Sequence, residues 1–261
     1  MKAEDINIGD VFALGEHKIL CGDALDANAI KQFLHVETIH QILTDPPYGC
    51  QYVEGKKSFI SGSVQQHDVI QNDHIQSDTE YREFTHKWLE AVRPFLAKKN
   101  AFYCFCNDKM LFALREGMLD AGFRFGQLLI WLKTATVVGR LDYQPQTELI
   151  CYGWHKTHVF HKSKDKNVLI CPKTKKNDLH PTMKPISLLR RLILNSSKIG
   201  QTIYDPFGGS GSTLIAAEQT KRRCLMVEIS PKYCAVICNR FEKLTGIPAE
   251  KISSLSVCPS R

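Results

Sequence analysis

Apolar residues along the chain alternate between two spacings. Short runs rich in β-branched and aromatic residues predict strands, and stretches with apolar positions three or four apart predict helices. Seven strands are expected, at 18–22, 38–44, 101–106, 125–133, 147–153, 202–205 and 223–228. Strands that alternate with helices in this way favour an α/β fold with a mostly parallel sheet and helices on both faces.

The helical stretches fall between these strands. They are expected at about 26–35, 79–94, 108–122, 180–197 and 231–245, with one more after the glycine-rich stretch at 205–213. Asp108 is predicted to cap the third helix and Gly122 to close it. Residues 50–79 are polar and irregular, which predicts a mobile surface loop.

Composition fits an ordinary globular chain. With 261 residues and 43% hydrophobic positions, we expect a single domain over 1–261. The amino terminus has no apolar core of signal-peptide length and no apolar run approaches the roughly 20 residues of a membrane span, so a cytoplasmic protein is expected. Ten irregularly spaced cysteines are then expected to be reduced and mostly buried, and Cys104 and Cys106, which alternate within a strand, to serve packing.

The net charge of +7 is concentrated in one segment. Seven lysines and two aspartates lie between His155 and Asp178. A solvated loop is the plain interpretation, and a nucleic-acid surface is the alternative. The candidate contacts are Lys156, Lys162, Lys164, Lys173, Lys175 and Lys176.

Three histidines at 155, 158 and 161 could hold a metal ion. No fourth ligand pattern lies near them and the chain has no CxxC pair, so we expect no metal and favour a basic, aromatic nucleic-acid surface.

The stretch DPFGGSGST at 205–213 follows a strand and opens a helix. Its glycines let backbone N–H groups approach a ligand, and Glu228, at the end of the next strand, is placed to accept hydrogen bonds from ribose hydroxyls. GxGxxG and GxxxxGK[ST] are both missing, and Asp205 would repel a pyrophosphate. A ligand with a ribose and a cationic amino-acid end fits, and S-adenosylmethionine is such a ligand. A plain structural turn is the alternative.

A second unusual stretch, TDPPYG at 44–49, comes directly after a predicted strand. Consecutive prolines donate no backbone hydrogen bonds and fix φ, so the chain must leave the sheet there as a stiff loop. Such a loop is suited to hold a ligand.

These two stretches, in this order, resemble the β class of DNA amino-methyltransferases, which methylate adenine N6 or cytosine N4. The segments ILCGD (19–23) and TMKP (182–185) also resemble family segments, as do EFTHKWL (83–89) and YQPQTELICYG (143–153). The resemblance implies a Rossmann-like, seven-stranded sheet in permuted order, with 18–22 as its third strand and 202–205 as its first. It also implies a short target-recognition segment at about 153–180, with the loop at 50–79 sharing that role.

The resemblance further implies the site residues. Asp45, Pro46, Pro47 and Tyr48 would be catalytic, and the cofactor would be bound by Asp23, Ala24, Lys184, Asp205, Phe207, Gly208, Gly209, Ser210, Gly211, Ser212 and Glu228. The Asp45 carboxylate and the Pro46 carbonyl would accept the two hydrogens of the target amine, and Tyr48 would stack on a base rotated out of the duplex.

The resulting expectation is a DNA adenine-N6 methyltransferase, monomeric or homodimeric, either part of a restriction-modification system or solitary. Three alternatives stay open. The cytosine-N4 enzymes more often carry SPPY, the glutamine methyltransferases usually carry NPPY after the glycine loop, and a catalytically silent binding protein would tend to lose the acid or the glycines.

Overall fold

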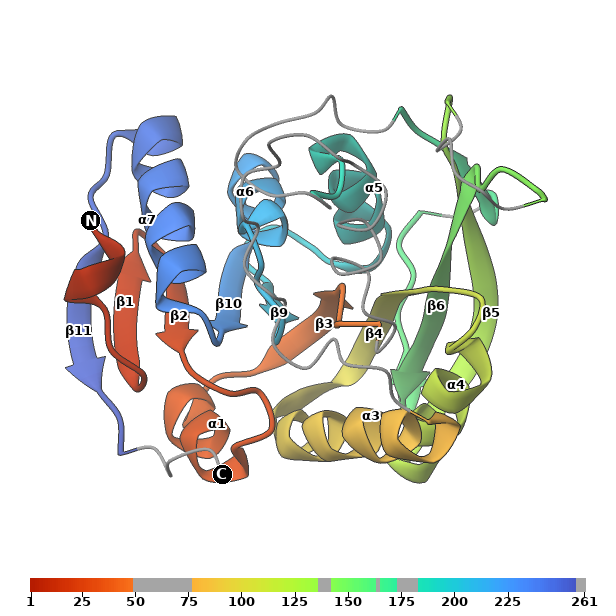
Figure 1. Ribbon diagram of the computed structural model, residues 1–261, viewed down its shortest axis with the longest axis horizontal. Coiled ribbons are helices and arrows are strands. Elements are labelled where there is room, and N and C mark those ends of the chain that lie inside the picture. Colours follow the sequence, from red (N-terminus) through yellow and green to blue (C-terminus); the bar gives the residue numbers. More distant parts are fainter. Residues whose placement is uncertain (49–76, 136–141, 163–164, 173–182, 257–261) are drawn as a thin grey trace.

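The computed structural model describes residues 1–48, 77–135, 142–162, 165–172 and 183–256. The loop predicted at 50–79 lies almost entirely outside these residues. One twisted sheet runs through the molecule, with helices on both of its sides (Figure 1).

The sheet contains eleven strands within the described part of the chain. They are β1 (Asp10–Leu14), β2 (His17–Cys21), β3 (Ile39–Thr44), β4 (Leu96–Cys106), β5 (Phe123–Leu132), β6 (Thr147–His155), β7 (Thr157–His158), β8 (Val168–Ile170), β9 (Thr202–Asp205), β10 (Arg223–Glu228) and β11 (Glu250–Ser254). Their order is β11-β1-β2-β10-β9-β3-β4-β6-β5-β8, and β7 pairs with β4.

The seven strands predicted from the sequence form one contiguous block of this sheet, β2-β10-β9-β3-β4-β6-β5. The first five of these are parallel, and β6 runs antiparallel to both β4 and β5. The predicted α/β, Rossmann-like fold is therefore confirmed. The remaining four strands extend the predicted sheet: β1 and β11 at one end, β8 at the other, and β7 beside β4.

Helices divide into two layers. The described helices are α1 (Ala27–Leu34), α3 (Asp78–Val92), α4 (Leu111–Asp120), α5 (Ile186–Ser196), α6 (Ser212–Gln219) and α7 (Pro231–Thr245), with short 3₁₀ turns η1 (Ala3–Asp5) and η2 (Arg93–Phe95). The apolar residues of α1, α3 and α4 pack into one core, and those of α5, α6 and α7 into another, on opposite faces of the sheet (Figure 1).

Side-chain caps explain where two of the described helices begin. Asp26 accepts hydrogen bonds from the first turn of α1, and Ser77 forms a capping box with Glu80 at the start of α3. The predicted cap at Asp108 is wrong, because α4 begins only at Leu111. There the Asn107 side chain accepts the backbone N–H of Met110 at 2.8 Å, which closes a turn between β4 and the helix and delays its start.

The eight described cysteines are free and buried. Cys104 and Cys106 lie within β4, where they contribute to the core, as the alternating pattern predicts. Of the described helices, none combines the length and the apolar character that a membrane crossing requires.

Candidate active site

Four acidic residues meet at one edge of the sheet. Asp205 ends β9, Glu228 ends β10, and Asp23 and Asp45 follow the last residues of β2 and β3. Because these strands are parallel, their carboxyl ends lie side by side, with Glu228 paired with Cys21 and Asp205 with Met226. The four acids therefore lie along one edge of the sheet.

Two loops begin side by side at this edge: the proline loop, which starts at Asp45, and the glycine loop at 206–211. A direct hydrogen bond joins the strand ends that precede them. The Thr44 hydroxyl, one residue before Asp45, donates to Asp205 Oδ1 at 2.7 Å, and the backbone N–H of Phe207 donates to the same oxygen at 3.1 Å. Burial raises the pKa of Asp205 to about 7, although the Thr213 and Thr44 hydroxyls favour the ionised form. The two stretches singled out in the sequence therefore begin next to each other at the carboxyl edge of the sheet.

The glycine loop has little room for side chains. A Cβ on Gly208 would lie 2.7 Å from Met226 Cγ, and Gly211 has φ +79° at the start of α6. The loop is tied to Glu228, whose Oε2 accepts the N–H of Gly209 at 2.7 Å while Oε1 accepts the N–H of Ser230 at 2.8 Å. Burial raises the pKa of Glu228 to about 7.

Other predicted cofactor residues surround this loop. Asp23 Oδ1 accepts the N–H of Leu25 at 2.9 Å, and Ala24 beside it is buried. Ser210 and Ser212 lie near the guanidinium of Arg240, which donates to the Ser210 carbonyl at 2.5 Å and lies 3.4 Å from the Ser212 hydroxyl. Arg240 was not anticipated from the sequence, and its contacts fix the loop against α7.

Phe207 forms the base of the glycine loop on the other face of the sheet. Its ring packs against Phe84 and Trp88 of α3, with centroids 5.5 and 5.7 Å apart. The segment EFTHKWL therefore supports the loop through aromatic packing.

Two side chains, Tyr48 and Lys184, hold the carboxylate of Asp45. Its Oδ1 accepts the hydroxyl hydrogen of Tyr48 at 2.6 Å, and its Oδ2 forms a short ion pair with the ammonium of Lys184. Pro46 beside it is buried and Pro47 is half-buried. Burial raises the pKa of Asp45, and the charge of Lys184 acts in the opposite direction.

Lys184 therefore lies with the proline loop. The sequence resemblance placed this residue among the cofactor contacts, whereas the structure pairs its ammonium with Asp45 and, at 3.3 Å, with Glu148 Oε2. Its nitrogen also lies 5.0 Å from the ring centre of Phe105. Burial would lower the pKa of Lys184, but the two carboxylates outweigh it and raise that pKa.

Glu148 and Lys133 are site residues that the sequence reasoning missed. Lys133 follows β5, and Glu148 is the second residue of β6, whose antiparallel direction brings its amino end to the catalytic edge. Their charged groups lie 2.8 Å apart. One signal in the sequence could have identified them. Lys133 ends the apolar run WLK and Glu148 lies near the start of the next strand, in TEL, so two opposite charges flank neighbouring strands.

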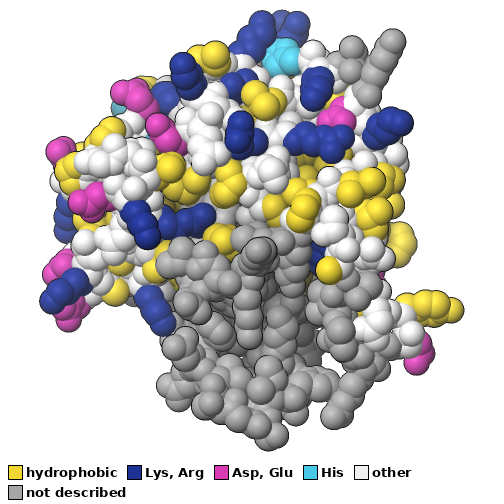
Figure 2. Space-filling view, turned by 90° about the horizontal axis from the view of Figure 1, so that it is seen from above, with side chains coloured by type: hydrophobic (Ala, Val, Ile, Leu, Met, Phe, Trp, Pro, Cys, Tyr) yellow, Lys and Arg dark blue, Asp and Glu magenta, His cyan; other side chains and the backbone are white. Residues whose placement is uncertain are grey.

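The basic segment is only partly described. Lys156 and Lys162 are exposed, while Lys164, Lys173, Lys175 and Lys176 lie outside the described residues. Figure 2 shows Lys and Arg side chains gathered in the upper right of one face, with few acidic side chains among them.

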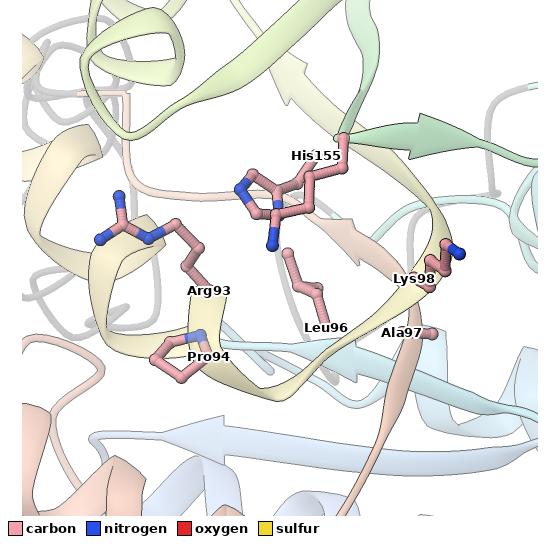
Figure 3. Close-up of a pocket in the computed structure, with 7 residues that line it drawn as sticks. Arg93, Pro94, Leu96, Ala97, Lys98 and His155 are labelled. Atoms are coloured by element: carbon pink, nitrogen blue, oxygen red, sulfur yellow. The ribbon is translucent and has the colours of Figure 1, made fainter.

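Lys156 lies far from the catalytic edge. It follows β6, and eight residues of extended chain place it roughly 25 Å from Glu148. With Arg93, Lys98 and His155 it lines a hollow of about 530 Å³. Within this hollow, Lys98 lies apart from Arg93 and His155 (Figure 3). This hollow includes His155, at the opposite end of β6 from Glu148, and none of the predicted catalytic residues lines it.

The three histidines considered as metal ligands have other contacts. The backbone N–H of His155 donates to Asn100 at 2.8 Å, the His158 ring packs against Trp154, and the N–H of His161 donates to the Asn195 carbonyl at 2.6 Å. No cluster of three potential ligands occurs among the residues that the structure describes.

The sheet order and the paired loops define a Rossmann-like methyltransferase. The profile of the N6_N4_Mtase family, described as DNA methylase, matches residues 39–239, so the chain belongs to this family. The protein is therefore a DNA methyltransferase of the N6/N4 type, and S-adenosylmethionine is its methyl donor, as the sequence predicted.

Curated relatives and solved structures agree with this assignment. The type II methyltransferase M2.DpnII of Streptococcus pneumoniae is 28% identical over 225 residues, which cover 79% of this chain and 83% of that protein. M.HpaI of Haemophilus parainfluenzae is 25% identical and covers 87% and 74%. The PvuII DNA methyltransferase, named as cytosine-N4-specific, has a similar fold, with a TM-score of 0.67, 18% identity, and coverage of 88% and 90%.

The M1.HpyAVI–SAM complex also shares the fold. Its TM-score is 0.62 at 22% identity, with coverage of 85% of this chain and 98% of that one. The family includes enzymes that act on adenine and enzymes that act on cytosine. Membership therefore identifies the type of reaction but not the target base.

Proposed function

We propose that the protein transfers a methyl group from S-adenosylmethionine directly to N6 of an adenine rotated out of DNA. The observation that carries this proposal is the hydrogen bond between Thr44 and Asp205, because it joins the strand ends that directly precede the acid at 45 and the glycine loop. The sequence DPPY favours adenine over cytosine.

The target amine is a weak nucleophile, because its lone pair is delocalised into the base. Hydrogen bonds from its two N–H groups to the Asp45 carboxylate and the Pro46 carbonyl would favour a pyramidal nitrogen with its lone pair directed at the methyl group. The nitrogen then forms a bond to the methyl carbon while the carbon–sulfur bond breaks and sulfur keeps its electron pair. The methylated amine, now positively charged, finally loses one proton to water, and the sulfur leaves as the neutral thioether. Tyr48 would stack on the displaced base, which is worth about 1–3 kcal/mol.

The glycine loop and its neighbours fit the donor. S-Adenosylmethionine supplies an electrophilic methyl on a sulfonium centre. Glu228 would accept the ribose hydroxyls, the lack of side-chain space at Gly208 lets the ligand approach the backbone, and Asp205 and Asp23 provide negative charge for a cationic ligand.

Product analysis tests the proposal. Purified protein, S-adenosylmethionine and genomic DNA are incubated, the DNA is digested to nucleosides, and the products are identified by mass spectrometry. N6-methyladenine is expected. N4-methylcytosine as the sole product would overturn the choice of base, and the absence of any methylated base would favour a silent binding protein. Asp45→Asn protein serves as the control for contaminating activity.

Sequencing of modified bases in DNA from cells that express the protein would give the recognition site. That site supplies a defined duplex for kinetic measurements. Two expectations stay predictions: that the protein is a monomer or a homodimer, and that residues 1–261 form a single domain.

A further inference from the structure

Asp45 has no free carboxylate oxygen in the described site. Tyr48 donates to Oδ1 at 2.6 Å, and Lys184 occupies Oδ2. A target amine that donates to Oδ2 therefore competes with the ammonium of Lys184 for this oxygen.

Lys184 has a second carboxylate within reach. Its nitrogen lies 3.3 Å from Glu148 Oε2, and this oxygen is buried without a hydrogen bond of good geometry among the described residues. The other oxygen of Glu148 is held by Lys133 at 2.8 Å. Glu148 is thus fixed in place, with its Oε2 already at ion-pair distance from the ammonium and able to become its main partner.

Glu148 is important because it provides a second negative charge for the buried ammonium of Lys184. The side chains of Lys184 and Lys133 are 8% and 6% exposed, so an ammonium that left Asp45 without a new partner would be a buried, uncompensated charge. The two positive charges of the lysines equal the two negative charges of the carboxylates in this cluster. The net charge therefore stays zero when Lys184 moves from one carboxylate to the other.

We propose that Glu148 is a positioning residue that receives Lys184 when the target base enters and so frees Asp45 to bind the amine. The inference rests on the proposed function of the same site. Glu148 acts through Lys184 and is itself not required to touch the base or the donor. Lys133 holds Glu148 in the orientation that accepts the ammonium.

The variant Glu148→Gln tests this exchange. The amide keeps the shape but loses the charge, so Lys184 should stay with Asp45. On a duplex carrying the mapped site, we expect the single-turnover rate to fall at least about tenfold, with S-adenosylmethionine affinity within about threefold of wild type. Glu90→Gln, which neutralises an exposed acid of α3 paired with Arg93, is the matched control and should show wild-type rates.

A pH profile separates positioning from a merely structural role. The negative charge of Glu148 raises the pKa of Asp45, so its removal should shift the acidic limb of kcat/KM to lower pH. A variant that only loosened the fold would lose activity without moving this limb. If Glu148→Gln is poorly folded, Glu148→Asp keeps the charge and should retain a larger part of the rate.

A double-mutant cycle gives the decisive result. Because Glu148 acts through Lys184, adding Glu148→Gln to Lys184→Met should cause no further loss. Additive losses, or a wild-type rate for Glu148→Gln, would overturn the inference while the wild-type enzyme still methylates DNA. A wild-type protein that forms no methylated base would instead overturn the proposed function, so the two failures are distinguishable.

Discussion

Thr44 donates a 2.7 Å hydrogen bond to Asp205 from the last residue of β3 to the last residue of β9. The two residues are 161 positions apart in the chain, and each directly precedes one of the two loops of the site. The bond connects the loop that would hold the base to the loop that would hold the donor. Thr44 is 1% exposed and Asp205 3%, so water does not compete for it.

Thr44→Val should weaken both the fold and the reaction. Valine fills the same space, but it leaves a buried carboxylate oxygen without this donor, which costs about 1–3 kcal/mol of unfolding free energy. We expect a lower urea midpoint and about a tenfold lower kcat, since the relative position of the two loops relaxes. Thr44→Ser keeps the hydroxyl and should stay close to wild type. Equal effects of valine and serine would contradict this role of the hydrogen bond.

Asp45→Asn should abolish methyl transfer and spare donor binding. An amide cannot accept the target N–H with the strength of a carboxylate, but Lys184 keeps Glu148 as a counter-ion, so the site should stay folded. The affinity for S-adenosylmethionine, measured by calorimetry, should remain within about tenfold, or 1.4 kcal/mol. Turnover near the wild-type value would refute the role given to Asp45.

Glu228 should make donor binding depend on pH near neutrality. Its carboxyl has a pKa of about 7 because of burial, and the ionised form is the better acceptor for ribose hydroxyls. Affinity for S-adenosylmethionine should therefore fall as pH drops below about 7, by up to about tenfold per pH unit. Calorimetry from pH 8 to 5.5 measures this.

The same pKa has the opposite effect on stability. A carboxyl whose pKa is about 7 when folded and 4.5 ordinarily binds its proton more tightly in the folded state, so its contribution stabilises the fold at low pH and is lost as pH rises through about 7. Asp205 titrates in the same range, so the difference between wild type and Glu228→Gln isolates Glu228. A variant with the wild-type pH dependence of affinity would exclude Glu228 as the titrating group.

The strands that build the site could be predicted because each is a clear apolar run beside a helix pattern. The strands that were missed have weaker signals. All five residues of β11 are exposed, so this strand has no apolar pattern. β1 pairs with β2 and with β11, and β11 lies near the other end of the sequence. β7 and β8 are two and three residues long, too short for a period to be read.

The acids of the site were predictable for a related reason. Asp205 and Glu228 each end a parallel strand and Asp45 directly follows one, and topology alone brings such ends together. Glu148 could not be placed in this way, because its position depends on β6 running antiparallel, with Cys106 opposite Leu149. The pairing of Lys184 with Asp45 depends on the position of the residues directly before α5, which no local pattern specifies.

Gly211→Ala should destabilise the protein more than the same change at Gly246. Both glycines have a positive φ, +79° and +76°, so alanine costs about 1–2 kcal/mol of backbone strain at either site. A Cβ at Gly211 would also lie 3.0 Å from Ile237 Cγ1, whereas no atom lies within 4 Å at Gly246. We expect an additional loss of about 1–3 kcal/mol at Gly211 in urea unfolding. Equal losses would show that Ile237 adjusts without cost.

The lysines of the basic segment should differ in their contribution to DNA binding. Residues 173–182 lie outside the described part of the chain. Just before them, Cys171 donates its N–H to Leu132, the last residue of β5, and just after them Lys184 pairs with Asp45. Both flanks of Lys173, Lys175 and Lys176 therefore lie at the catalytic edge, whereas Lys156 follows the opposite end of β6.

Changing Lys173, Lys175 and Lys176 together to glutamine should weaken DNA binding and reduce the slope of log K against log salt by about 2–3, because each phosphate contact contributes about 0.9 to that slope. Lys156→Gln, roughly 25 Å from Glu148 along β6, should leave the slope within about 0.3 of wild type. Fluorescence anisotropy with a labelled duplex between 50 and 200 mM salt measures both. An unchanged slope in the triple variant would mean that these three lysines only solvate a loop.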